Sequence, residues 1–154
     1  MNTIILGVGN PILKDDGVGI HVANIIEKEL INSDIKIDVA FTGGMNLLDL
    51  MRGHDKAILI DAMRMKDKKI GEVGLFDINN FDTFHTCNPH DVSLNEAINL
   101  AKKLGDDNIP KEIKIVGINI GEFSYEFGEN LSFEVEKAIP KAIDIVKKEV
   151  EKYE

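Results

Sequence analysis

Two aspartates and a histidine lie in three separate segments of the chain that a fold can bring together. Asp16 follows the first apolar run, Asp61 directly follows another, and His90 precedes a helical pattern. Carboxylates and a neutral imidazole are suitable ligands for a borderline transition metal. The same groups also serve in general acid–base catalysis. The residue types therefore predict either a metal site or an acid–base site.

Each of the three residues also has a plainer structural explanation. Asp16, with Asp15 beside it, precedes a helical pattern, where an aspartate commonly caps free backbone N–H groups. His90 has a similar position and can cap a helix or bond a loop. Asp61 is more unusual, because a carboxylate after the apolar run AILI must be paired or coordinated if it is buried. The other histidines, in less promising positions, are expected to be solvated: His21, His54 and His85.

The single cysteine, Cys87, stands three residues before His90. This spacing suits a soft second ligand, although a plain loop thiol is the simpler interpretation. The chain has no Gly-x-Ser-x-Gly turn, no His-Glu-x-x-His helix and no group of cysteines. The sequence therefore offers no candidate for metal-free nucleophilic catalysis.

Short apolar runs alternate with helical patterns along the chain, which is typical of an α/β fold. We expect strands at 3–8, 36–41, 56–60, 72–76 (a short edge strand) and 112–118, with a loop at 62–69. Helical patterns start near Gly17 and Met45, another follows Pro89, and the last lies in the C-terminal segment that carries Val135 to Val150. The prediction is a single domain, residues 1–154. It is a three-layer sandwich with a mostly parallel twisted sheet of about five strands and helices on both faces.

Three helices carry apolar stripes that predict their buried faces. The first stripe is Val18, Val22, Ile25, Ile26 and Leu30; the next is Leu94, Ala97, Ile98, Ala101 and Leu104; the last is Val135, Ala138, Ile139, Ala142, Val146 and Val150. Pro140 interrupts the last pattern, so a kink or a restart of that helix is expected.

The composition narrows the classes of function. The formal net charge is −9 over 154 residues, which disfavours nucleic-acid binding and docking on anionic membranes. No run approaches the roughly 18 apolar residues of a membrane helix, and one cysteine permits no internal disulfide. We expect a soluble cytoplasmic protein.

Ligands of open α/β sheets bind beyond the carboxyl ends of the strands, and two known kinds of site belong there. A dinucleotide-binding turn is suggested by Gly7-Val8-Gly9, but it requires a glycine where Ile12 stands. A receiver-like phosphoacceptor signalling domain, with Asp61 as the acceptor, is the better alternative. It leaves His90 unused and requires a lysine after the last strand, where this chain has Asn119.

Six segments, in this order, resemble the hydrogenase maturation protease family. They are Gly7-Val8-Gly9-Asn10, Asp15-Asp16-Gly17-Val18-Gly19, Ile60-Asp61-Ala62, Pro89-His90-Asp91 before Leu94, Val116-Gly117-Ile118, and Phe127-Gly128 to Val135. The segments are spread along most of the chain, so the resemblance extends over nearly its whole length.

The resemblance implies a metal-dependent, aspartic-type endopeptidase. It would remove the C-terminal extension from the precursor of a nickel–iron hydrogenase large subunit after nickel insertion. It also implies that Asp16, Asp61 and His90 are the metal ligands and catalytic site, and that the metal is nickel carried by the substrate. Other divalent metals would be able to occupy this site in vitro. The glycine-bearing loop with Thr42, Gly43 and Gly44 is implied to receive the substrate.

Overall fold

The structure of the protein is a computed structural model. It describes residues 2–30, 32–41, 45–78, 89–122 and 126–152, without the side chains of 45, 46 and 89–93.

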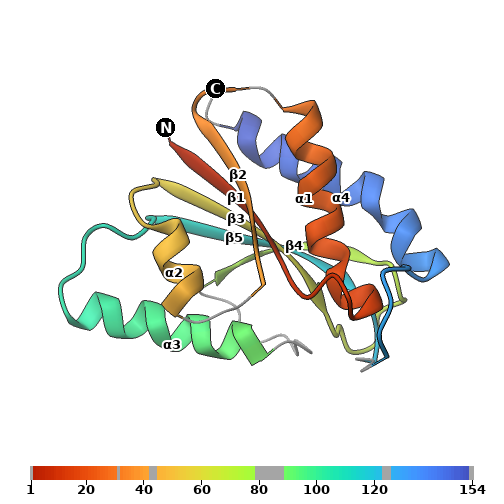
Figure 1. Cartoon of the computed structure of the whole chain (residues 1–154). Helices are drawn as coiled ribbons and strands as arrows, with labels where there is room; N and C mark the ends of the chain where they lie inside the picture. Colours follow the sequence, from red (N-terminus) through yellow and green to blue (C-terminus); the bar gives the residue numbers. More distant parts are fainter. Residues whose placement is uncertain (1, 31, 42–44, 79–88, 123–125, 153–154) are drawn as a thin grey trace.

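Five strands form one sheet in the order β2-β1-β3-β5-β4 (Figure 1). The strands are β1 (Thr3–Val8), β2 (Ile35–Ala40), β3 (Lys56–Met63), β4 (Val73–Asp77) and β5 (Glu112–Asn119). β2, β1, β3 and β5 are parallel, and β4 is antiparallel to β5 at the edge. The predicted α/β fold with a mostly parallel sheet is therefore confirmed, as is the edge position of the fourth strand.

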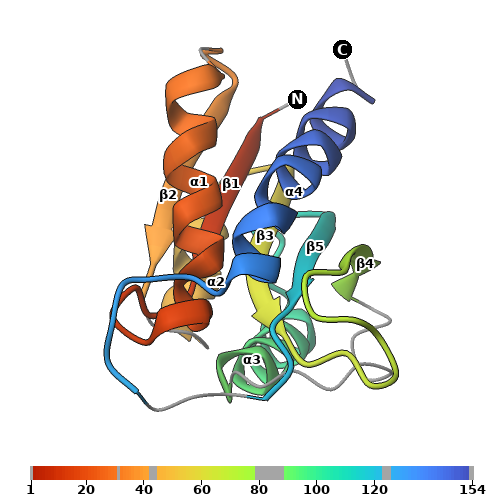
Figure 2. The same cartoon turned by 90° about the vertical axis from the view of Figure 1, so that its right-hand side faces the viewer.

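Helices cover both faces of this sheet. They are the 3₁₀ turn η1 (Lys14–Gly17), α1 (Val18–Glu29), α2 (Met45–Met51), α3 (Pro89–Lys103) and α4 (Phe133–Glu151). One core lies under α2 and α3, and the other lies under α1 and α4. Figure 2 shows α1 and α4 side by side over one face, with α3 on the opposite face. No helix among the described residues has both the length and the apolar character needed to cross a membrane.

The apolar stripes predict the buried faces well, with two exceptions. All six stripe residues of α4 are buried. Leu104 is wrong, because α3 ends at Lys103 and leaves this side chain 77% exposed. Ile25 is wrong too, since it is more than a third exposed on the outer side of α1. The predicted restart at Pro140 does not occur, because α4 continues through it.

A buried ion pair joins the sheet to the last helix. Lys56 begins β3 and Glu149 lies near the end of α4, with exposed fractions of 1% and 2%. Lys56 Nζ donates to Glu149 Oε1 at 2.8 Å and to the Glu149 carbonyl at 3.1 Å. Burial alone would raise the pKa of Glu149, but the hydrogen bonds and charges of Lys56 and Lys152 outweigh it. The pKa of Glu149 therefore lies below its ordinary value.

Removing one partner of this pair is expected to destabilise the protein strongly. Lys56→Met leaves the buried Glu149 carboxylate without its buried partner and with only the exposed Lys152 beside it, which costs about 3–5 kcal/mol of unfolding free energy. The double variant Lys56→Met/Glu149→Leu removes both charges and recovers most of that loss. Urea unfolding at pH 7 measures both, and equal losses in the single and double variants would contradict this role.

The pH dependence of the unfolding free energy provides a second test of the Lys56–Glu149 pair. Because folding lowers the pKa of Glu149, the pair stabilises the protein above the unfolded pKa of about 4.3. That contribution is lost as the pH falls through the lower folded value. Wild type should therefore lose stability relative to the double variant between about pH 5 and pH 3.

Candidate functional site

The sheet has its topological switch point between β1 and β3. The chain leaves the carboxyl end of β1 toward α1 on one face of the sheet, and after β3 it passes through β4 to α3 on the other face. Connections that diverge in this way leave a crevice beyond the carboxyl ends of the two strands. η1 follows β1 and contacts β3 there. This is the edge to which the sequence assigned its candidate residues.

Asp61 lies on β3 rather than after it, because this strand continues to Met63 instead of ending at Ile60. It is 1% exposed and sits opposite Gly117 of β5. Successive side chains of a strand point to opposite faces. Leu59 and Met63 belong to the core under α2 and α3, so Asp61 is directed to that same face of the sheet.

Asp16 is the buried acidic residue of η1, with 4% of its surface exposed. Its Oδ2 accepts a hydrogen bond from the backbone N–H of Asn10 at 2.9 Å. Asp16 is not the N-cap residue of either helix, because Leu13 has that position in η1 and Gly17 has it in α1. The carboxylate points back into the loop after β1, so that loop and Asp16 fix one another.

Two glycines bring this loop and α1 close to β3. Gly9 has φ +148°, a conformation that L side chains rarely adopt, and a Cβ there would collide with the carbonyl oxygen of Asp16. A Cβ on Gly19 would collide with the carbonyl oxygen of Ile60, the residue before Asp61. The approach allowed by Gly19 therefore places the start of α1, and η1 before it, against the segment of β3 that carries Asp61.

The segment before α4, which contains Gly128 and Ser132, is hydrogen-bonded to the loop that leads into η1 and to η1 itself. Lys14 N–H donates to the Gly128 carbonyl and Gly128 N–H donates to the Ile12 carbonyl, both at 2.8 Å. Asp15 Oδ1 accepts from the backbone N–H of Ser132 at 2.7 Å. Asp15 thus has a positioning contact with a distant segment, in place of a cap on its own helix.

His90 is the second residue of α3, and its backbone position follows from the topology. β5 is parallel to β3, so β5 begins at the amino edge. There the backbone N–H of Lys111, just before β5, donates to the Asp55 carbonyl at 3.1 Å. α3 must therefore run from the carboxyl edge back to the amino edge, with His90 near its start. This helix covers the face to which Asp61 is directed.

Several predicted residues lie outside the described parts of the structure. The side chain of His90 is among them, and so are Thr42, Gly43, Gly44, His85 and Cys87. Among the described residues there is no group of three or more possible metal ligands. The set Asp16, Asp61 and His90 therefore remains a prediction. The two buried carboxylates that are described have the donor chemistry that suits a divalent transition metal.

Asn119 is a buried residue whose importance the sequence did not reveal. It stands where a receiver-like domain requires a lysine, and it is 1% exposed at the end of β5. Its Oδ1 accepts from Met65 N–H at 2.9 Å, and its Nδ2 donates to the carbonyls of Lys68 and Lys69 at 3.0 and 2.9 Å. The residue organises the loop after β3 and supplies no cation for a phosphoryl group.

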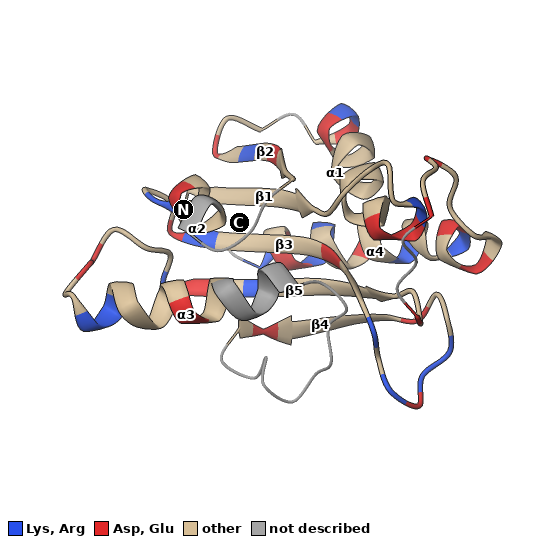
Figure 3. Ribbon diagram, turned by 60° about the horizontal axis from the view of Figure 1, so that its bottom comes forward, with Lys and Arg blue, Asp and Glu red and all other residues tan. Residues whose placement is uncertain are grey.

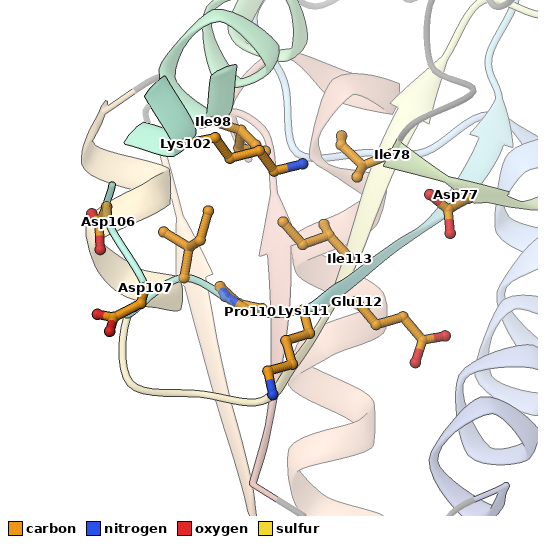
Figure 4. A pocket seen from close by; sticks show the side chains of 11 residues that line it. Asp77, Ile78, Ile98, Lys102, Asp106, Asp107, Pro110, Lys111, Glu112 and Ile113 are labelled. Atoms are coloured by element: carbon orange, nitrogen blue, oxygen red, sulfur yellow. The ribbon is translucent and has the colours of Figure 1, made fainter. Parts of the chain in front are cut away.

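A cavity of about 300 Å³ lies at the opposite end of the sheet (Figure 4). It is lined by apolar side chains including Ile78, Ile98 and Ile113 and by charged side chains of both signs, among them Lys102 and Glu112. The end of α3 and the start of β5 form it, so it belongs to the amino edge and not to the Asp16–Asp61 edge.

A family model described as hydrogenase maturation protease matches residues 20–149. The chain belongs to this family. The matched range includes Asp61 and His90 and begins after Asp16. As a member, the protein is a peptidase of hydrogenase maturation.

Individual relatives agree with this assignment. The hydrogenase 2 maturation protease of Escherichia coli is 28% identical over 121 residues, which is 77% of this chain and 73% of that protein. The solved E. coli hydrogenase maturating endopeptidase HybD has the same fold, with a TM-score of 0.82 at 24% identity over 99% of this chain and 94% of that one. A nickel–iron hydrogenase maturation protease of Thermococcus kodakarensis has a TM-score of 0.73 at 25% identity, covering 96% and 98%.

The glycine contacts lead to a test of how this protease positions Asp16. Gly9→Ala forces both a strained backbone and a collision with the Asp16 carbonyl, for an expected loss of about 2–5 kcal/mol of unfolding free energy. Gly53→Ala is the matched control, because Gly53 also has positive φ (+82°) but no atom lies within 4 Å of the place that an added methyl group would take. Its loss should be about 1–2 kcal/mol. Equal losses on urea unfolding would show that the contact with Asp16 is unimportant.

Proposed function

We propose that this protease removes the C-terminal extension of a nickel–iron hydrogenase large-subunit precursor after nickel has been inserted. Asp16, Asp61 and His90 recognise the nickel that the substrate carries. The observation that carries the proposal is the burial of two carboxylates from β3 and η1 at the switch point, in a chain of this family.

The geometry of the edge supports His90 as the third member of the site. Asp61 is directed to the face covered by α3, and that helix begins at the same edge with His90 in its first turn. Two carboxylates and one imidazole leave coordination positions for groups of the substrate. Such an open site suits a metal that arrives with the precursor.

Substrate-bound nickel can supply a Lewis acid that polarises the scissile carbonyl or activates a water molecule. The contribution of the protein is orientation. The Asn10 N–H holds one oxygen of Asp16, and the β3–β5 ladder holds the backbone of Asp61. Nickel bound to these residues positions the precursor's C-terminal segment against the protease, and an unloaded precursor lacks that anchor.

The substrate class agrees with the relatives, one of which is named for hydrogenase 2. Thr42, Gly43 and Gly44 directly follow β2 in the chain, and β2 is the neighbour of β1 in the sheet. We assign to this glycine-bearing loop the role of receiving the precursor.

Processing of the loaded precursor tests the proposal. Purified protease should shorten the nickel-loaded precursor and leave the nickel-free precursor intact, as followed by mass spectrometry. Asp61→Asn, Asp16→Asn and His90→Ala should each lower the processing rate at least about 100-fold, because each removes a ligand of the nickel that anchors the substrate. Equal cleavage of both precursors would contradict the nickel-recognition part.

Matched variants separate this role from folding. His54→Ala is the control for His90, because His54 precedes β3 at the amino edge. Asp144→Asn is the control for the two aspartates, because Asp144 is an exposed residue of α4. Both controls should process the loaded precursor at the wild-type rate, and circular dichroism should show that every variant is folded.

A further inference from the structure

We propose that the lysine loop, residues 64–69 between β3 and β4, is a docking surface for an acidic segment of the hydrogenase precursor. This inference rests on the proposed function, because it names a second contact made by the same substrate.

The charge of the lysine loop is opposite to that of the chain. Its sequence, RMKDKK, has four basic residues and one acidic residue, whereas the whole chain has a formal net charge of −9. Figure 3 shows this loop as a mostly basic segment that extends from the sheet between β3 and β4. All four basic side chains are exposed. A local basic surface on an acidic protein selects acidic partners at short range, because salt screens the remaining charges within about 8–10 Å.

The lysines of this loop are available to a partner. Arg64 pairs with Glu122 at 2.6 Å. Within the described part of the chain, Lys66, Lys68 and Lys69 make no ion pair. Three ammonium groups in four residues repel one another, and a partner with carboxylates relieves that repulsion.

Hydrogen bonds from the buried side chain of Asn119 fix the backbone of the lysine loop. Besides its bonds to Met65, Lys68 and Lys69, this buried amide accepts from Gly121 N–H at 3.1 Å. The Asn119 backbone also accepts from Gly71 N–H at 2.8 Å, where the loop returns to the sheet. The carbonyls of Lys68 and Lys69 therefore face the end of β5, and the lysine side chains of the loop are exposed.

The backbone of the loop is bent at positions that cost conformational energy. Asp67 has φ +63°, which is uncommon for a residue other than glycine. Gly71 has φ +89° and packs against the carbonyl of Glu134 in α4, where a Cβ would collide. An ordinary solvated connection does not need a buried asparagine and a contact with a helix to fix its backbone. The fixed backbone of this loop therefore indicates that the positions of its lysines matter.

The loop lies beside the candidate site. It begins at Arg64, directly after β3 ends and three residues after Asp61, which is a distance of about 10 Å at the usual rise of a strand. A precursor whose nickel reaches Asp61 therefore brings its neighbouring residues to the lysine loop. Acidic side chains in that part of the precursor are the partner that fits.

The first test measures processing of the nickel-loaded precursor by Lys66→Glu/Lys68→Glu/Lys69→Glu. KM should rise about 10-fold, since each exposed ion pair contributes roughly twofold and reversal adds repulsion, and added salt should raise the wild-type KM toward the variant's. Lys28→Glu/Lys36→Glu/Lys103→Glu is the control, with the same change in net charge at exposed lysines elsewhere, and its KM should stay at the wild-type value. Equal KM values for loop variant and wild type would overturn the docking surface and leave the proposed function intact.

The second test needs no processing, so it distinguishes failure of the surface from failure of the function. Fluorescein-labelled decaglutamate is titrated with each protein at low salt, and its anisotropy is followed. Binding by wild type and control, weakened about 10-fold in the loop variant, supports the surface even if no precursor is cleaved. Equal binding by all three proteins, or tighter binding of a single-stranded oligonucleotide than of decaglutamate, would overturn it.

Discussion

The site depends on a close approach of backbone to backbone at the carboxyl edge of the sheet. Gly9 allows the loop after β1 to lie on the carbonyl of Asp16, and Gly19 allows α1 to lie on the carbonyl of Ile60. A side chain at either position would push η1 away from β3. Because Gly9 lies against Asp16 and Gly19 lies against the residue before Asp61, the two glycines set the relative positions of Asp16 and Asp61. Both belong to the segments that resemble the family.

The amino and carboxyl edges of the sheet differ in their buried charged residues. At the amino edge, Lys56 and Glu149 form a pair of opposite charges that ties β3 to α4. At the carboxyl edge, the buried acidic side chains are Asp16 and Asp61, and Asp16 accepts a hydrogen bond from the Asn10 N–H. An edge with two buried carboxylates and a nearby histidine-bearing helix end is suited to a divalent metal, and the proposed substrate supplies one.

Much of the fold could be predicted from the sequence because burial leaves a simple pattern. Apolar runs such as TIILGV indicate strands that are buried on both faces, and the stripe of α4 indicates its buried side. All five strands and the edge position of β4 could be predicted from such patterns.

Where the prediction failed, tertiary contacts determined the structure. The β3–β5 ladder extends β3 past Asp61, and the end of α3 exposes Leu104. The set Asp16, Asp61 and His90 stays a prediction from the sequence. The contacts around Asp16 could not be predicted, because the bond from Asn10 to Asp16 and the contact of Asp15 with Ser132 depend on the folded loops. Asn119 seemed only a missing lysine, and its role depends on loop carbonyls that no local pattern encodes.

We propose that nickel in the precursor gains ligands from this protease. The proposed role of Asp16, Asp61 and His90 depends on that step. Nickel K-edge X-ray absorption is the direct measurement, made on a loaded precursor that has been rendered uncleavable, alone and in complex with the protease. Additional nitrogen and oxygen ligands are predicted in the complex, and they should disappear when Asp61→Asn/His90→Ala replaces the wild type. A nickel coordination that is unchanged by adding wild-type protease would contradict the proposed role of Asp16, Asp61 and His90.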